Sequence, residues 1–113
     1  MVKKSYTPKQ GDIIWMQFNP QAGHEKSGHR PAIVISPEVY NQKTGLAILC
    51  PITSKVKDHP FEVLLPENFP VQGAILSDQI KNMDWRVRGA KFIGEIPNEI
   101  LEEVREKLEL LIF

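Results

Sequence analysis

The chain has a single cysteine, no long apolar run and no net charge. Cys50 cannot form a disulfide within the chain, and its place in an apolar run predicts a small buried thiol in a reducing cytoplasm. No apolar run approaches the roughly 20 residues that a membrane-spanning helix needs. The residues after Met1 lack the apolar segment of a secretion signal. We therefore expect a cytoplasmic protein without a membrane segment.

Common catalytic motifs are also missing. The sequence has no GxxxxGK followed by Ser or Thr, no HExxH, no CxxC and no GxSxG. His24, His29 and Cys50 do not have the spacing of a convincing zinc site. The sequence therefore predicts neither a metal nor a cofactor.

What the chain does have is an apolar content of 42% in 113 residues, enough for a core and suited to one domain over residues 1–113. The charge is unevenly distributed. Residues 95–113 carry six acidic and two basic side chains, so residues 1–94 have an excess of four basic ones. This leaves room for a local anion-binding face, although composition alone favours a solvated, Glu-rich final helix as the explanation.

Short apolar runs rich in β-branched and aromatic residues predict six strands. These cover residues 13–18, 32–35, 46–52, 61–65, 73–77 with a continuation to 80, and 91–96. Pro31 suits the first position of the second strand. We expect one helical turn at residues 37–41, a turn at 41–45 and a break at 82–85.

The end of the chain predicts a helix with Asn98 as its N-cap. Its apolar residues fall on one helical stripe, made of Ile100, Leu101, Val104, Leu108, Leu111 and Ile112. Several short strands and one terminal helix indicate an α+β domain, a small antiparallel sheet or barrel with the helix packed on it.

A polar stretch at residues 19–31 separates the first two predicted strands and carries Glu25, His29 and Arg30. A polar loop between buried strands is a common way to mount a binding or catalytic site. Arg30 directly precedes the apolar run of the second strand, and its guanidinium matches phosphate in a two-pronged fashion. A structural ion pair with Glu25 is an equally good interpretation.

For each of the other polar and aromatic candidates, the sequence allows both a functional and a structural interpretation. The hydroxyls of Thr53 and Ser54 follow a strand directly and either face the same cleft as Arg30 or close a local turn. Lys55 and Lys57 either steer phosphate or keep the protein soluble, and Trp15 and Phe18 are either stacking platforms or core. A guanidinium, a hydroxyl and a carboxylate or imidazole allow cleavage of RNA by its own 2′-hydroxyl without a metal.

Seven blocks, in this order, cover almost the whole chain and resemble the MazF/PemK toxins of bacterial toxin–antitoxin pairs. They are residues 11–15 (GDIIW), 28–37 (GHRPAIVISP), 40–45 (YNQKTG), 51–54 (PITS), 60–63 (PFEV), 78–81 (DQIK) and 85–86 (WR). The resemblance implies an SH3-like barrel with a C-terminal helix, forming a homodimer. It implies a metal-independent endoribonuclease that cuts single-stranded mRNA and leaves a 2′,3′-cyclic phosphate and a 5′-hydroxyl. It also implies an antitoxin whose acidic tail covers the RNA groove.

Carried over by position, the resemblance assigns catalysis to Arg30 and Thr53, with Glu25 important in some members and His29 a weaker candidate. We expect the remaining site residues to bind RNA: Trp15, Phe18, Asn19, Ser54, Lys55, Lys57 and Gln79. Similar members often have Cys-Thr-Thr where this chain has Ile52-Thr53-Ser54, which keeps the threonine and changes its neighbours. Base preference is therefore expected to differ.

Two other classes of protein fit the same pattern. One is a non-catalytic inhibitor of DNA gyrase on the same fold, but the chain ends in Leu-Leu-Ile-Phe rather than the Trp-Gly-Ile-like close on which such inhibitors rely. The other is an SH3-like peptide-binding module, which would not be toxic on expression.

Overall fold

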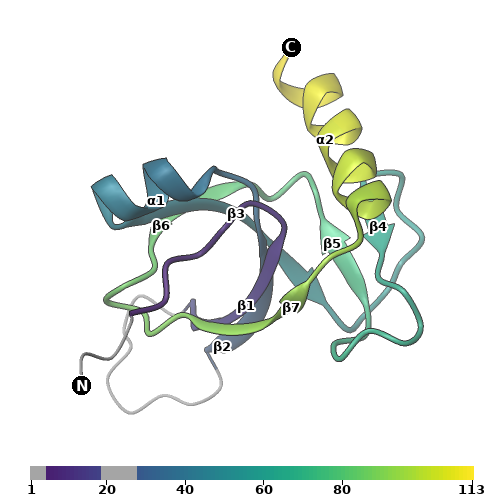
Figure 1. The fold of residues 1–113 in the computed structure, drawn as a ribbon. Coiled ribbons are helices and arrows are strands. Elements are labelled where there is room, and N and C mark those ends of the chain that lie inside the picture. Colours follow the sequence, from purple (N-terminus) through teal and green to yellow (C-terminus); the bar gives the residue numbers. More distant parts are fainter. Residues whose placement is uncertain (1–4, 19–27) are drawn as a thin grey trace.

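The computed structural model describes residues 5–18 and 28–113. In these residues the chain forms an antiparallel sheet of seven strands and two helices (Figure 1). The strands are β1 (Asp12–Gln17), β2 (His29–Val34), β3 (Leu46–Thr53), β4 (Glu62–Leu64), β5 (Ala74–Leu76), β6 (Lys81–Asp84) and β7 (Lys91–Glu95), and the helices are α1 (Glu38–Thr44) and α2 (Asn98–Ile112). The predicted α+β class, an antiparallel sheet with a C-terminal helix, is confirmed.

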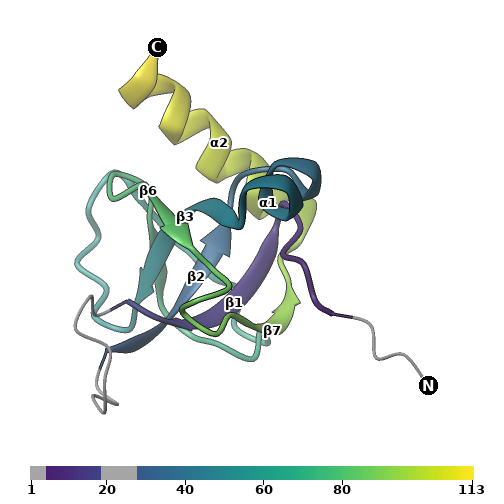
Figure 2. The same ribbon diagram turned by 90° about the vertical axis from the view of Figure 1, so that its left-hand side faces the viewer.

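The sheet curls strongly but does not close (Figure 2). Its strand order is β4-β5-β3-β2-β1-β7, and β6 pairs with β3 off this path. Because the path ends at β4 and β7, the predicted SH3-like barrel is only a loose description of an open, curved sheet. The long strand β3 joins the two parts, since its earlier residues pair with β2 and β6 and its last two residues pair with β5.

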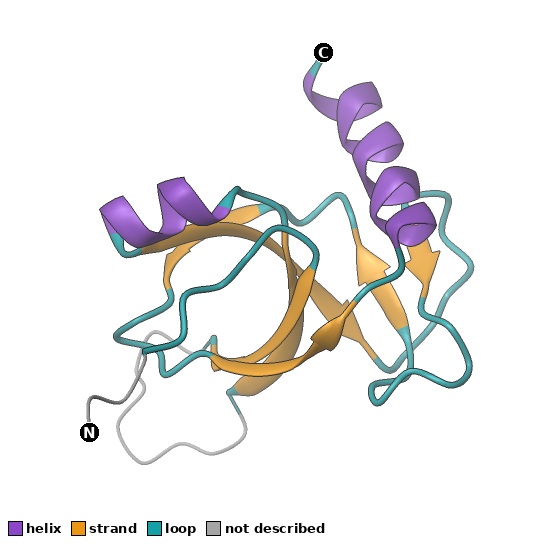
Figure 3. Cartoon of the chain, in the orientation of Figure 1, coloured by secondary structure: helices purple, strands orange, loops and turns teal. Residues whose placement is uncertain are grey.

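The strands β1, β2 and β3 are buried on both faces, as their apolar runs predict. Alternate residues enter two separate apolar clusters, so that Ile13 and Ile33 lie in one cluster and Ile14 and Val34 in the other. The first cluster receives α2 through Val104 and Leu108. Figure 3 shows α2 beside β4 and extending away from the sheet toward the C-terminus.

Several predicted boundaries are wrong because tertiary pairing overrides local pattern. The predicted break at residues 82–85 is largely strand β6, in which Met83 pairs with Ala47 of β3. The fifth strand ends at Leu76 rather than continuing to Ile80, because the chain turns there and the Gln79 N–H bonds the Leu76 carbonyl.

Pro31 is the third residue of its strand rather than the first. The Phe18 N–H donates to the Gly28 carbonyl at 2.9 Å. Phe18 and Gly28 therefore form a hydrogen-bonded pair. Hydrogen-bonded and non-hydrogen-bonded pairs alternate along an antiparallel ladder, and the Trp15–Pro31 pair lies three pairs further on, so it is a non-hydrogen-bonded pair. Its nitrogen faces away from β1, so the missing N–H leaves the pairing of β2 with β1 intact.

Both helices differ from expectation at their ends. One continuous helix, α1, replaces the helical turn predicted at residues 37–41 and the turn predicted at 41–45. Its C-cap is Gly45, which adopts the left-handed conformation (φ 74°). The N-cap of α2 is Pro97 rather than Asn98. The predicted apolar stripe is buried only in its first part, because Leu111 and Ile112 are 47% and 54% exposed where α2 leaves the sheet.

Candidate functional site

The two residues predicted to share a catalytic pocket do lie in one recess. The register of β2 and β3 pairs Ala32 with Pro51, and two further residues in the same direction bring Arg30 across from Thr53. Opposite residues of an antiparallel pair project from the same face. Both side chains line a hollow of about 370 Å³, named here the Arg30 hollow. Its other lining residues are Trp15, His29, Pro31, Ile52, Ser54, Lys55, Val71 and Gln72.

Arg30 is held by an aromatic ring. Its guanidinium carbon lies 5.7 Å from the centroid of the Phe18 ring, a cation–π distance. Phe18 is itself fixed because Arg88 donates to the carbonyl oxygens of Gln17 and Phe18, at 3.1 Å each. Among the residues that the structure describes, no carboxylate forms an ion pair with Arg30. In this part of the chain the guanidinium is therefore free to take an anionic ligand.

Thr53 ends β3 and is half-buried. Its Oγ1 accepts a hydrogen bond from the backbone N–H of Lys55 at 3.1 Å. This bond closes the local turn that was one of the two interpretations of Thr53. It uses the hydroxyl oxygen only as an acceptor. The hydroxyl proton can still be donated, so the turn orients the hydroxyl without using up its donor.

Gly73 packs directly against Thr53, although the sequence pattern did not single it out as a site residue. A Cβ at Gly73 would lie 2.1 Å from the Thr53 carbonyl oxygen, and its φ of +129° also disfavours a side chain. Only glycine lets the chain entering β5 approach Thr53 this closely. A glycine at the start of a predicted strand is the one signal in the sequence that points to such a close approach.

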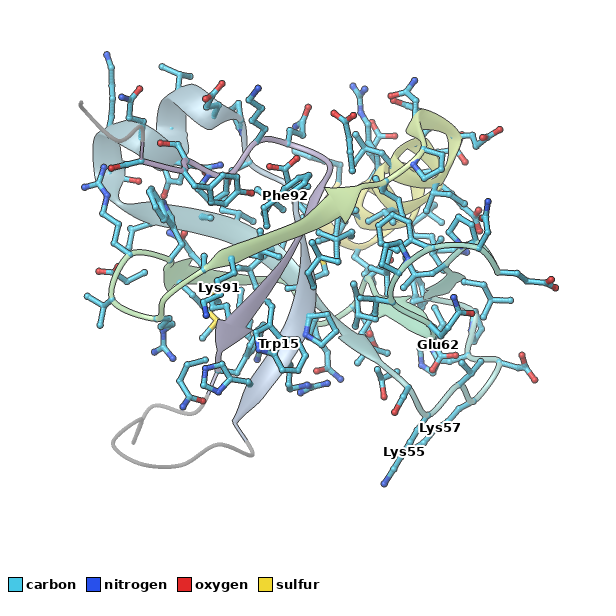
Figure 4. The ribbon with its side chains drawn as sticks, turned by 60° about the horizontal axis from the view of Figure 1, so that its bottom comes forward. Trp15, Lys55, Lys57, Glu62, Lys91 and Phe92 are labelled. Atoms are coloured by element: carbon cyan, nitrogen blue, oxygen red, sulfur yellow. The ribbon has the colours of Figure 1, made fainter. Side chains whose placement is uncertain are left out.

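Trp15 forms an exposed flat surface on the wall of the Arg30 hollow. Its indole is 41% exposed and stacks on the His29 imidazole, with ring centroids 6.0 Å apart and planes 20° apart. This exposure favours the stacking interpretation over the core interpretation. Lys91 of β7 pairs across from Trp15, and Figure 4 shows the two side chains close to each other.

A second hollow of about 260 Å³ adjoins the first and shares Thr53 and Lys55 with it. We name it the Asp78 hollow; its other lining residues are Lys57, His59, Glu62, Leu76, Asp78 and Gln79. Lys57 and Gln79, predicted to bind RNA, lie here and not in the Arg30 hollow. Figure 4 shows Lys55, Lys57 and Glu62 on the side of the molecule away from Lys91.

Two of the predicted site residues, Glu25 and Asn19, lie outside the described residues. Within residues 5–18 and 28–113, no group of three or more His, Cys, Asp or Glu side chains is placed to hold a metal ion. In the same part of the chain, neither helix has the length and apolar character needed to cross a membrane.

Cys50 is buried and free, as predicted. Burial, with a smaller contribution from the Asp78 carboxylate, raises the pKa of the Cys50 thiol to about 12. The thiolate is the reactive form of cysteine. Cys50 is therefore a core residue and not a nucleophile.

Known proteins resemble this chain in sequence and in fold. Residues 9–112 match the family described as PemK-like, MazF-like toxin of type II toxin-antitoxin system. The endoribonuclease toxin MazF of Escherichia coli K12 is 44% identical over 107 residues, which are 95% of this chain and 96% of that protein.

Solved structures agree. The crystal structure of MazF from Deinococcus radiodurans has a TM-score of 0.88 and 48% identity, covering 96% of this chain and 98% of that one. A MazE-MazF crystal structure from the same organism has a TM-score of 0.87 and 47% identity, covering 95% of this chain and 97% of that one. Because the family match spans nearly every residue and the folds superpose over nearly their full length, this chain belongs to the PemK-like, MazF-like toxin family of type II toxin–antitoxin systems.

Proposed function

We propose that this chain, acting as one toxin domain, is an endoribonuclease that cuts single-stranded mRNA at a short sequence without a metal ion. The observation that carries this proposal is the Arg30 hollow, in which a guanidinium and a hydroxyl line one recess beside an exposed indole. The relatives' names support it, since E. coli MazF and ChpB are both named endoribonuclease toxins.

The reaction follows from what the hollow offers. The 2′-oxygen of RNA attacks the adjacent phosphorus, the bond from phosphorus to the 5′-oxygen breaks, and a 2′,3′-cyclic phosphate and a 5′-hydroxyl result. The intermediate gains negative charge on its phosphoryl oxygens. Arg30 neutralises that charge through two parallel N–H donors, and Thr53 donates its hydroxyl proton to the same group.

One proton must leave the 2′-hydroxyl and another must reach the 5′-oxygen. We assign these transfers to His29, whose imidazole lines the hollow, and to Glu25 from the polar stretch before β2. The guanidinium supplies the positive charge that a metal would otherwise provide, so the proposed reaction needs no metal ion.

The surroundings of the hollow suit single-stranded RNA. An exposed indole can stack on an unpaired base, Lys55 lines the Arg30 hollow, and Lys57 lines the adjoining one. An acidic antitoxin segment would compete for the same positive groups. The MazE-MazF structures similar to this chain support such a partner, and we propose that the toxin acts as a homodimer.

Incubation of the purified protein with a long mixed-sequence RNA in excess EDTA tests the proposal. We expect cleavage at a short recurring sequence, with 5′-hydroxyl and 2′,3′-cyclic phosphate ends. The Arg30→Ala variant, purified in parallel, controls for contaminating nucleases. Loss of cleavage in EDTA would contradict the metal-free mechanism, and absence of cleavage under all conditions would contradict the function.

The gyrase-inhibitor alternative is not favoured, because the similar proteins of known activity are named endoribonucleases. A DNA supercoiling assay with gyrase separates it from the proposed function. We expect no inhibition.

A further inference from the structure

The Asp78 hollow adjoins the Arg30 hollow, in which the proposed function places the cleaved phosphate. Thr53 and Lys55 line both hollows. An RNA strand with its reacting phosphate at Thr53 therefore has its neighbouring base within reach of the second recess. Leu76 adds an apolar surface to that recess, which suits the face of a base.

The charges of the Asp78 hollow are unexpected for a site that holds only phosphate. Lys55 and Lys57 attract a phosphate, but Glu62 and Asp78 repel one. Glu62 has a structural task, because its carboxylate accepts the backbone N–H of Lys57 at 3.1 Å. In the described part of the chain, the Asp78 carboxylate accepts no hydrogen bond, and the His59 Nε2 atom lies 3.9 Å from its Oδ2 atom.

His59 does not hydrogen-bond Asp78. The backbone N–H of Phe61 donates to His59 Nδ1 at 3.1 Å, which leaves Nε2 as the ring nitrogen nearer Asp78. The distance of 3.9 Å from Nε2 to Asp78 Oδ2 exceeds a hydrogen bond. Asp78 thus presents a charged acceptor with unused capacity to the hollow.

We propose that the Asp78 hollow is a base-recognition subsite in which Asp78 selects a base with an exocyclic amino group over uracil. This inference rests on the proposed function. The amino groups of cytosine, adenine and guanine donate N–H to a carboxylate, which is the usual way Asp and Glu read a base edge. Uracil has one edge N–H, flanked by two carbonyl oxygens that a carboxylate repels.

Cytosine and uracil make a matched pair of ligands, since they share ring size and differ at the amino or carbonyl group. Short oligomers of deoxycytidine and of deoxyuridine lack the 2′-hydroxyl and cannot be cleaved. Their Kd values for the full-length protein can therefore be measured directly by titration. We expect the cytosine oligomer to bind about tenfold more tightly, at the lower end of the discrimination that a well-formed contact to a base edge provides.

Asp78→Asn tests the assignment. An amide offers a donor as well as an acceptor, so we expect the ratio of the two Kd values to fall close to one. Both oligomers carry the same charge, so the general gain in affinity from removing a negative side chain cancels in the ratio. Glu106→Gln, an exposed charge removal on α2, should leave the ratio unchanged. Thermal unfolding checks that each variant is folded.

Equal affinities of the two oligomers for the unmodified protein, or an unchanged ratio in Asp78→Asn, would overturn the subsite. The binding assay does not depend on catalysis. A protein that cuts RNA but shows no preference between the oligomers would refute the subsite alone. A protein that prefers cytosine but cuts no RNA would refute the proposed function alone.

Discussion

The two adjoining hollows share Thr53 and Lys55 but are built from different parts of the fold. In the Arg30 hollow, Trp15, Arg30 and Thr53 belong to β1, β2 and β3, whose pairing fixes their positions. In the Asp78 hollow, Lys55, Lys57 and His59 lie between β3 and β4, and Asp78 and Gln79 between β5 and β6.

This difference matches the proposed division between chemistry and recognition. Stabilising a transition state requires groups held to within a fraction of an ångström, which paired strands provide. Recognition residues on connecting segments can change without disturbing the sheet. We therefore expect substitutions in the Arg30 hollow to remove cleavage and those in the Asp78 hollow to alter affinity and base preference.

The largest effect is expected from Arg30→Ala and Thr53→Ala. Removal of one transition-state donor typically costs about 10²–10³ in rate. Single-turnover cleavage of a defined RNA measures the loss. Thr53→Ser keeps the hydroxyl and should retain most of the activity, whereas Arg30→Lys keeps the charge but loses the two-pronged geometry. Full activity in both alanine variants would remove the distinction between the hollows.

Gly73→Ala should have an intermediate effect on both stability and rate. Its methyl group would displace the Thr53 backbone, and overpacking of this kind costs about 1–3 kcal/mol. Gly89→Ala is the matched control, since Gly89 also has positive φ but has open space within 4 Å of the position that a Cβ would take. Chemical denaturation measures the free energy of unfolding of both variants. The cleavage rate of each is measured at a temperature where both are folded. Equal losses in the two variants would show that Thr53 tolerates the displacement.

The smallest effect is expected from Lys55→Ala and Lys57→Ala. Each would remove one proposed phosphate contact, so the slope of log K against log salt should fall by about 0.7 for single-stranded nucleic acid. Affinity for an uncleavable deoxy-oligonucleotide across a salt series measures it. Lys43→Ala on α1, where Lys43 lines neither hollow, should leave the slope unchanged. A slope change as large in Lys43→Ala would show that the lysines act only through overall charge.

Local pattern predicted much of the fold but not its ends. Apolar runs identified β1, β2 and β3, because burial on both faces demands apolar residues at nearly every position. The prediction of a break at residues 82–85 was wrong. Their polar side chains do not have the pattern of a strand, and β6 forms because it pairs with β3. The prediction for Leu111 and Ile112 was wrong too, because a helical period cannot tell where a helix leaves its sheet.

The order of residue types along this chain was enough to predict an antiparallel α+β fold and a free buried thiol, because these depend on short-range periodicity. The resemblance to the MazF/PemK toxins, which rests on short blocks of residues, named Arg30 and Thr53 as the candidate pair. Three features depend instead on the register of β2 on β3 and of β5 on β3. They are the recess that this pair shares, the need for glycine at position 73 and the unused acceptor on Asp78. Register joins residues that lie far apart along the chain, and no local pattern contains that information.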